Sequence, residues 1–162
     1  MTVLTFDGQR LPDSLEGKGP YQTNHGISAN QGVLELVVDG ITGWTQDRLA
    51  IGELDKVSGL DRENIVALAV DILRPRDLDL GQWASLIFVL QSHDNYWMPL
   101  PEVKLQELTP GEWKHVELEL SDQQRSSMKA FFKVVTVVNS GTKLKGSLYF
   151  DNLGFVVRTE RK

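Results

Sequence analysis

Hydrophobic and polar residues alternate along residues 32–39, 83–92 and 113–120 of the chain. In residues 83–92, for example, Leu86, Phe88 and Leu90 share one parity. Side chains along a β-strand point alternately to its two faces, so a period of two predicts strands that bury one face.

The remaining apolar stretches also have the character of strands. Residues 64–73 are apolar on both parities, and their β-branched residues and the stop at Arg74-Pro75 favour a central strand over a buried helix. Residues 131–139 predict another strong strand, and residues 3–7 and 48–54 predict short ones.

Turn signals separate these stretches. Residues 93–95 predict the turn of a hairpin that joins the strand before them to residues 96–98. Residues 8–19 have the composition of a loop and residues 40–44 that of a turn, whereas residues 121–129 allow one helical turn with Ser121 as its N-cap. About eight to ten strands with no long helix predict one all-β domain over residues 1–162, an antiparallel β-sandwich.

The stretch 146–155 reads as a strand that carries a carboxylate at its centre. Its apolar and aromatic residues suit a buried strand, but Asp151 and Asn152 are residue types that strands disfavour. A charged Asp151 there requires compensation from backbone donors, a cation or a metal. We expect either a closing strand with such a compensated acid or a bulge at a sheet edge.

Composition limits the class of partner. The 162 residues are 41% hydrophobic and 24% charged, which is typical of a globular protein, and the formal net charge is -5. This charge argues against nucleic acid or an anionic membrane surface as the main partner, and it suits a neutral or cationic ligand. The chain has no cysteine, which excludes disulfides and zinc-thiolate sites.

No stretch approaches the ~20 consecutive apolar residues of a membrane-spanning helix. The N-terminus also lacks a basic region followed by an apolar run. We therefore expect a soluble chain.

The C-terminal half resembles the β-jelly-roll carbohydrate-binding modules that are appended to bacterial plant-polysaccharide hydrolases. Gly111-Glu112-Trp113 is similar to the Gly-Glu-Trp opening of a strand in that family, and Leu120-Ser121-Asp122 to the turn that follows it. Residues 132–139 resemble the penultimate strand, which ends in Asn, and residues 146–155 the closing Tyr-Ile-Asp-Asn-Ile strand. Upstream, residues 3–7, 70–73 and 84–97 are similar to the first strand, a strand ending before Pro, and the ligand-facing hairpin of mannan- or β-glucan-binding modules.

The resemblance implies a galactose-binding-like jelly roll and a structural calcium ion between the first and last strands. The matching acidic positions are Asp7 and Asp151. Oxygen ligands of this kind are those that calcium prefers. The alternative for Asp151 is a hydrogen-bonded carboxylate at a strand end.

Recognition of a neutral sugar needs exposed aromatic surfaces together with side chains that both donate and accept hydrogen bonds. Trp97, next to Tyr96 after the predicted hairpin turn, is the first candidate platform, and Trp44 and Trp83 are further ones. The polar candidates are Gln91, Asn139 and Arg74. Trp113, by contrast, is assigned to the core.

Catalytic motifs are absent from the sequence. It contains no Gly-x-Ser-x-Gly, no His-Glu-x-x-His and no phosphate-binding loop. Glu117 and Glu119 could form a carboxylate pair, but outward acids on an alternating strand are more often a solvated face. His25, His93 and His115 show no metal-ligand spacing.

We therefore expect a non-catalytic module that binds a β-linked plant polysaccharide, mannan or glucomannan first and β-glucan second. It would hold a parent catalytic domain, a glycoside hydrolase, against its substrate outside the cell. The alternatives are a jelly-roll polysaccharide lyase or hydrolase, and a β-sandwich that serves protein assembly.

Overall fold

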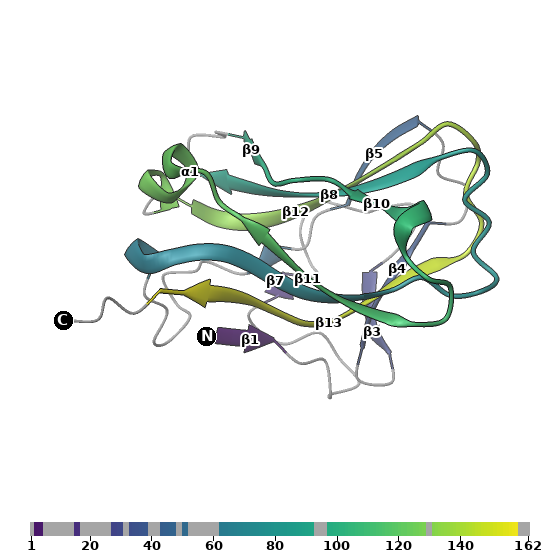
Figure 1. The fold of residues 1–162 in the computed structure, drawn as a ribbon, viewed down its shortest axis with the longest axis horizontal. Helices are drawn as coiled ribbons and strands as arrows, with labels where there is room; N and C mark the ends of the chain where they lie inside the picture. The colour runs from purple at the N-terminus through teal and green to yellow at the C-terminus, as the bar shows by residue number, and fades with distance from the viewer. Residues whose placement is uncertain are drawn as a thin grey trace.

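The computed structural model describes residues 2–4, 15–16, 27–30, 33–38, 43–47, 50–51, 62–92, 97–128 and 131–158. Within these residues the strands form two large antiparallel sheets and one small two-stranded sheet. Figure 1 shows the large sheets as two layers that face each other. This is the β-sandwich, jelly-roll architecture that the sequence predicts.

The six-stranded sheet has the order β11-β7-β13-β4-β3, with β1 also paired to β13. Its strands are β1 (Thr2–Leu4), β3 (Ile27–Asn30), β4 (Val33–Val37), β7 (Ile65–Leu73), β11 (Trp113–Glu119) and β13 (Ser147–Val157). The closing strand β13 therefore lies inside the sheet, between β7 on one side and β4 and β1 on the other.

The five-stranded sheet has the order β10-β8-β12-β5, with β9 also paired to β8. Its strands are β5 (Gly43–Asp47), β8 (Ala84–Ser92), β9 (Trp97–Pro99), β10 (Val103–Lys104) and β12 (Phe131–Ser140). The predicted hairpin is confirmed, because β8 and β9 are antiparallel with Gln91 opposite Trp97.

The core lies between the two sheets and is made by their inward-facing apolar residues. Its largest fully buried side chains are Phe88, Phe150, Leu36, Ile65, Leu68, Ile72 and Leu86. Phe88 of one sheet meets Phe150 of the other edge to face, with the ring centroids 5.7 Å apart. Aromatic pairs prefer this geometry, so the two layers are joined by packing at the centre of the sandwich.

Short elements complete the described fold. They are β2 (Leu15–Glu16), paired with β6 (Ala50–Ile51), the 3-10 helices η2 (Arg62–Asn64) and η3 (Leu105–Glu107), and the helix α1 (Asp122–Ser126). Ser121 caps α1 as predicted: its hydroxyl accepts from the Gln124 N–H, and the Gln124 side chain accepts from the Ser121 N–H. No helix in the described part of the chain is long and apolar enough to cross a membrane.

Three local predictions were wrong. The predicted loop at residues 8–19 contains strand β2. The predicted turn at residues 40–44 ends earlier, because β5 begins at Gly43 and includes Trp44. Trp113 does not lie in the core but is 46% exposed. It begins the edge strand β11 on the same parity as His115 and Glu117, and that parity faces outward while Leu118 is buried.

The acid in β13 is explained by a bulge, although not one at a sheet edge. The register with β7 shifts between Asp151 and Gly154, and Asn152 has a positive φ of 50°. Two residues thus separate Phe150 from Leu153, and both of these apolar side chains reach the core. The bulge lets a central strand carry Asp151 and Asn152 without placing them in the core.

Candidate functional site

The outer face of the five-stranded sheet gathers most of the predicted sugar-binding positions. Leu86, Phe88 and Leu90 of β8 lie in the core, so the residues between them point outward. Directly opposed residues share a face, and Asn139 of β12 is opposite both Ser85 of β8 and Trp44 of β5. The register therefore places Trp44 and Asn139 side by side on this outer face; for Trp44 only the backbone is described.

Trp83 continues the same face by one row. It directly precedes β8, and its carbonyl accepts a hydrogen bond from the Gly141 N–H at 3.3 Å, which extends the pairing of β8 with β12. Its side chain is 45% exposed. A Cβ atom at Gly141 would lie 2.4 Å from Trp83 Nε1, so the indole packs against the Gly141 backbone where no side chain intervenes.

A short turn fixes the backbone on which this indole rests. The buried Ser140 hydroxyl accepts from the Thr142 N–H at 3.2 Å, and it also lies 2.5 Å from the Thr142 carbonyl, to which it donates. The Thr142 hydroxyl in turn donates to the Leu80 carbonyl. These bonds tie the connection between β12 and β13 to the residues before Trp83.

Trp97 and Gln91 lie at the other end of the face. They are directly opposed on β9 and β8. Gln91 is buried, and the half-buried Trp97 packs against a small apolar cluster made of Val89, Val135 and Val137. Gln91 is eight positions after Trp83, so the two ends are ~26 Å apart along an extended strand. The middle of the face is covered, whereas Trp83 is exposed at its end.

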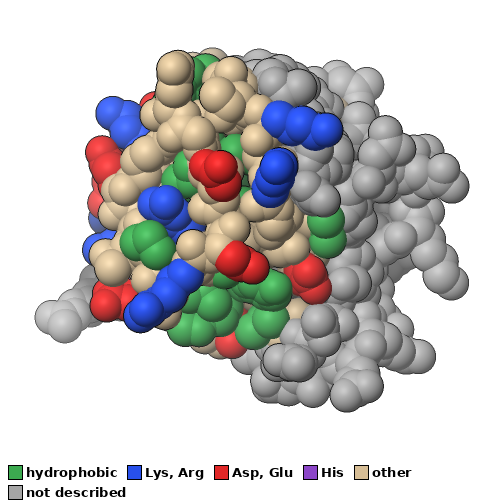
Figure 2. All heavy atoms as spheres, turned by 90° about the vertical axis from the view of Figure 1, so that its right-hand side faces the viewer, with side chains coloured by type: hydrophobic (Ala, Val, Ile, Leu, Met, Phe, Trp, Pro, Cys, Tyr) green, Lys and Arg blue, Asp and Glu red, His purple; other side chains and the backbone are tan. Residues whose placement is uncertain are grey.

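Figure 2 views the end of the sandwich at which the connections 74–83 and 141–146 meet (compare Figure 1). Hydrophobic side chains are exposed there among separate basic and acidic ones, without a large area of one charge. On the outer face itself, the register assigns no acidic residue to the outward positions of the described strands β8, β9 and β12.

The other predicted site residues are elsewhere or outside the described part of the chain. Arg74 directly follows β7 of the six-stranded sheet, and its guanidinium Nη1 lies 3.3 Å from the carbonyls of Leu105 and Leu108, to which it donates. The structure thus gives Arg74 a role in holding the η3 segment. Tyr96 and Asp7 lie outside the described residues.

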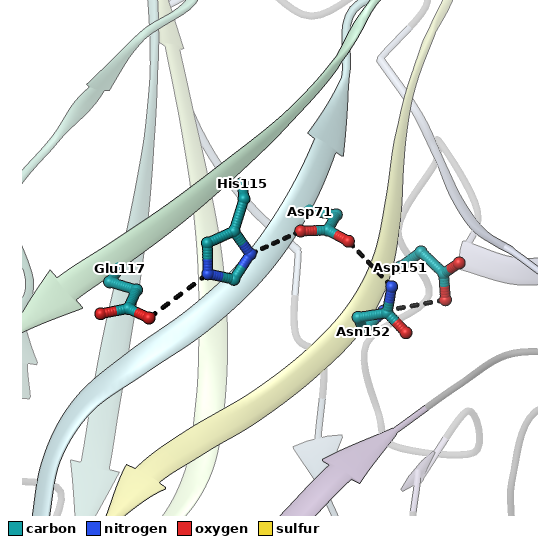
Figure 3. A network of polar contacts seen from close by, with 5 residues as sticks. All are labelled: Asp71, His115, Glu117, Asp151 and Asn152. Atoms are coloured by element: carbon teal, nitrogen blue, oxygen red, sulfur yellow. Dashed lines mark hydrogen bonds and ion pairs between the residues drawn. The ribbon is translucent and has the colours of Figure 1, made fainter. Parts of the chain in front are cut away.

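A network of polar side chains crosses the outer face of the six-stranded sheet (Figure 3). Asp71 of β7 accepts from Asn152 Nδ2 at 2.8 Å and lies 2.6 Å from His115 Nδ1 on β11. His115 Nε2 is 3.4 Å from Glu117, and the Asn152 N–H donates to Asp151 at 2.8 Å. The network links three adjacent strands.

The two carboxylates of the network that face His115 favour its protonated form. Both ring nitrogens face a carboxylate, and an imidazole can donate from both only when it carries the extra proton. Hydrogen bonds to Asp71 and then Glu117 raise the pKa of His115 above 6.5, against a small opposing effect of burial. His115 therefore carries positive charge over a wider pH range than a free histidine.

Sequence reasoning did not find this network, because it depends on which strands are neighbours. It also missed the roles of Ser140 and Gly141 beside Trp83, because that contact again depends on the pairing of β8 with β12. Within the described residues, no group of three His, Asp or Glu side chains has a metal-binding arrangement. Glu117 and Glu119 are exposed on β11, as predicted for a solvated face.

Comparison with solved structures places this geometry in a known fold. The chain is similar to TmCBM27, a carbohydrate-binding module with specific mannan recognition, at 18% identity and a TM-score of 0.59, with 98% of this chain and 97% of that one covered. It is also similar to CBM27-1 of Caldicellulosiruptor saccharolyticus, solved in complex with mannohexaose, at 17% identity and a TM-score of 0.56, with 94% of each chain covered.

The chain has the β-sandwich fold of these carbohydrate-binding modules. The same fold recurs inside a larger enzyme: an agarase, AgWH50C, matches 96% of this chain at 10% identity and a TM-score of 0.63, but this chain spans only 26% of the agarase. No family model and no curated protein matches the sequence.

Proposed function

We propose that the protein binds a neutral, β-linked polysaccharide without catalysing a reaction, through the outer face of its five-stranded sheet. The observation that carries the proposal is the exposed indole of Trp83, packed on the Gly141 backbone in the row next to Asn139 and Trp44. A flat aromatic surface beside a side-chain amide offers what a pyranose ring requires: packing for its C–H groups and a partner for its hydroxyls.

The charges of this face do not favour a cationic ligand. The register assigns no acidic residue to the outward positions of the described strands β8, β9 and β12, where Ser85, Gln91 and Asn139 are uncharged, and it places Lys104 and Lys133 opposite Ser85 and Gln91. Mannan or glucomannan is the first candidate, because TmCBM27 recognises mannan and the other module was solved with mannohexaose. β-Glucan is the second.

The exposed part of the face places the ligand at its Trp83 end. Val89, Val135 and Val137 in the middle of the face are buried, and Trp97 at the far end is half-buried against them. Trp83 is therefore the platform on which the proposal rests.

The acidic pair that could suggest hydrolysis lies away from this face. Glu117 and Glu119 belong to β11, an edge strand of the opposite sheet, and Glu117 already faces His115. The proposed role is attachment: the module holds a hydrolase of the same secreted protein against the polymer. The fold's occurrence within the longer agarase chain supports this arrangement.

The proposal also includes a structural calcium ion. Asp151 is a half-buried carboxylate in a central strand, and Leu153, two residues away, is opposite Leu4 of β1. Asp7 follows three residues after Leu4 in the sequence. Asp151 and Asp7 would hold the ion, which would supply the positive charge that offsets burial of the Asp151 carboxylate.

Affinity electrophoresis against glucomannan, galactomannan, β-glucan and xylan tests the function. Wild-type protein should be retarded by glucomannan or galactomannan, and Trp83→Ala should lose at least about tenfold in affinity, as expected for a lost stacking contact. Trp113→Ala is the matched control, since it removes an equally exposed indole from the other sheet. Equal loss in both variants, or no retardation by any polymer, would contradict the proposal.

A further inference from the structure

The outer face of the six-stranded sheet carries a second aromatic row that the proposed function does not use. Trp113 of β11 is opposite Leu73 of β7, which is opposite Tyr149 of β13, which is opposite Glu35 of β4. The row crosses four adjacent strands, so it spans ~14 Å at the usual strand spacing. Trp113 is 46% exposed, and Leu73 and Tyr149 are half-buried. The result is a flat apolar strip on the side of the sandwich opposite to Trp83.

The neighbouring row is polar and has a fixed geometry. It contains His115, Asp71 and Asp151, directly opposed on β11, β7 and β13. The hydrogen bonds of Asp71 to His115 and to Asn152 hold its carboxylate against the sheet (Figure 3). A ligand lying along the aromatic row would meet these side chains without having to order them first.

The two rows carry mostly negative charge. Three carboxylates, those of Glu35, Asp71 and Glu117, surround the aromatic row, against the one positive charge that His115 carries when protonated. The pKa of Tyr149 is raised by burial and also by the charges of Glu35 and Asp77, which places a fourth carboxylate near the row. The opposite face has no acidic outward position on its described strands β8, β9 and β12.

We propose that this outer face is a second binding surface, whose ligand is a cationic sugar: glucosamine units with protonated amines in a β-linked polymer. The pyranose ring would pack on Trp113 and Leu73, and its ammonium group would lie near Asp71, Glu117 or the ring of Trp113. A tryptophan ring attracts a cation over its face, and carboxylates at the rim add Coulomb attraction. This surface goes beyond the proposed function, since both the face and the ligand differ.

The charge and direction of the apolar strip favour a cationic sugar over a neutral sugar and over a basic peptide. A neutral sugar can donate hydroxyl hydrogen bonds to the surrounding carboxylates, but it gains no Coulomb attraction from their charges. A basic peptide would find its strongest backbone partners along β11, which among the described strands pairs only with β7, rather than across the strands. The strip runs across the strands, and this direction suits a short, flat oligosaccharide.

Isothermal titration calorimetry with two hexamers at mildly acidic pH tests the proposal. One probe is the hexamer of glucosamine, and the other is the hexamer of N-acetylglucosamine, which has no charge. Wild-type protein should bind the first at least about tenfold more tightly than the second, and added salt should weaken the binding. Trp113→Ala should lose about tenfold in affinity for the glucosamine hexamer.

Two control variants separate this surface from the first one. Trp83→Ala should bind the glucosamine hexamer like the wild type, and Trp113→Ala should still bind glucomannan. Glu117→Gln, which removes one charge and keeps the shape, should weaken glucosamine binding with an unchanged circular dichroism spectrum. The proposal is overturned if both hexamers bind equally, if Trp113→Ala has no effect, or if a hexalysine peptide binds more tightly than the glucosamine hexamer. Failure of glucomannan binding alone would overturn only the proposed function.

Discussion

At the scale of single residues, His115 shows how the neighbouring strand sets the behaviour of a side chain. Its ring lies between Asp71 and Glu117, and both raise its pKa above 6.5. Because the pKa of His115 is raised in the folded state, its contacts with Asp71 and Glu117 stabilise the fold fully below pH 6.5. This contribution to stability is lost as the pH rises through the folded-state pKa of His115.

His115→Gln should therefore cost more stability at acidic than at alkaline pH. Because the pair is largely exposed, the difference should be about 0.2–1 kcal/mol and should shrink in high salt. Urea unfolding of both proteins across this pH range measures it. A cost that grows with pH would show that the imidazolium is not the stabilising form.

Gly141 supports the Trp83 indole by having no side chain. A Cβ atom at this position would meet the indole at 2.4 Å, so Gly141→Ala must displace the ring. We expect polysaccharide affinity to fall by about three- to tenfold, with a shift of the Trp83 fluorescence and with stability lowered by less than about 2 kcal/mol. Retained affinity with a shifted emission would mean that the ring's position does not matter for binding.

Trp113 marks the limit of reasoning from single residues. Its neighbours in sequence suggested a core residue, but the alternation of Val116, Leu118 and Leu120 already assigns residue 113 to the opposite face. The alternation along β11 indicates an outward Trp113, whereas the Gly-Glu-Trp motif suggested a buried one. The contacts of Arg74 with Leu105 and of His115 and Asn152 with Asp71 could not be predicted, because in each pair the partners lie more than thirty residues apart along the chain.

At the scale of elements, the bulge in β13 reconciles an apolar closing strand with two polar residues. Asn152 takes a positive φ, which Asn tolerates better than most residues, and its side chain donates to Asp71. Asn152→Ala should cost about 1–3 kcal/mol of stability, because it combines backbone strain with a lost hydrogen bond.

Asn152→Gly separates these two effects in the same denaturation experiment. Glycine accepts the positive φ but cannot bond to Asp71, so the variant should lie between the wild type and Asn152→Ala. If both variants are as stable as the wild type, the bulge does not depend on Asn152.

The periodicity of the sequence predicted the positions of the longer strands, but it did not predict which strands pair. The period of two located β4, β8 and β11, and continuous apolar residues located β7. Nothing local shows that β13 lies between β7 and β4, since strand order depends on contacts between distant segments. Short strands such as β2 and β5 were missed because a few residues carry too little pattern.

At the scale of the whole molecule, the proposed calcium ion should link the closing strand to the start of the chain. Removal of calcium with a chelator should lower the melting temperature, and a saturating excess at about 100 times Kd should restore about 2.7 kcal/mol. Differential scanning calorimetry measures this, with Asp151→Asn as the variant that should no longer respond. A wild-type melting temperature that is indifferent to both chelator and calcium would rule the ion out.

The sandwich also separates two kinds of surface. One outer face has an exposed tryptophan and no acidic residue at the outward positions of the described strands β8, β9 and β12, and the other has an exposed tryptophan among carboxylates. The sequence could predict an overall charge of -5, but only the strand register shows that the acids gather around Trp113 rather than Trp83.

The most direct test of the proposed function is an NMR titration of the isotope-labelled protein with mannohexaose. We predict that the amide shifts lie at the Trp83 end of β8 and β12, at Ser85 and Asn139, together with the Trp83 indole N–H, while Trp113 and His115 on the opposite face stay unchanged. Shifts confined to β7 and β11, or no shifts at saturating ligand, would contradict binding of a neutral polysaccharide on the five-stranded sheet.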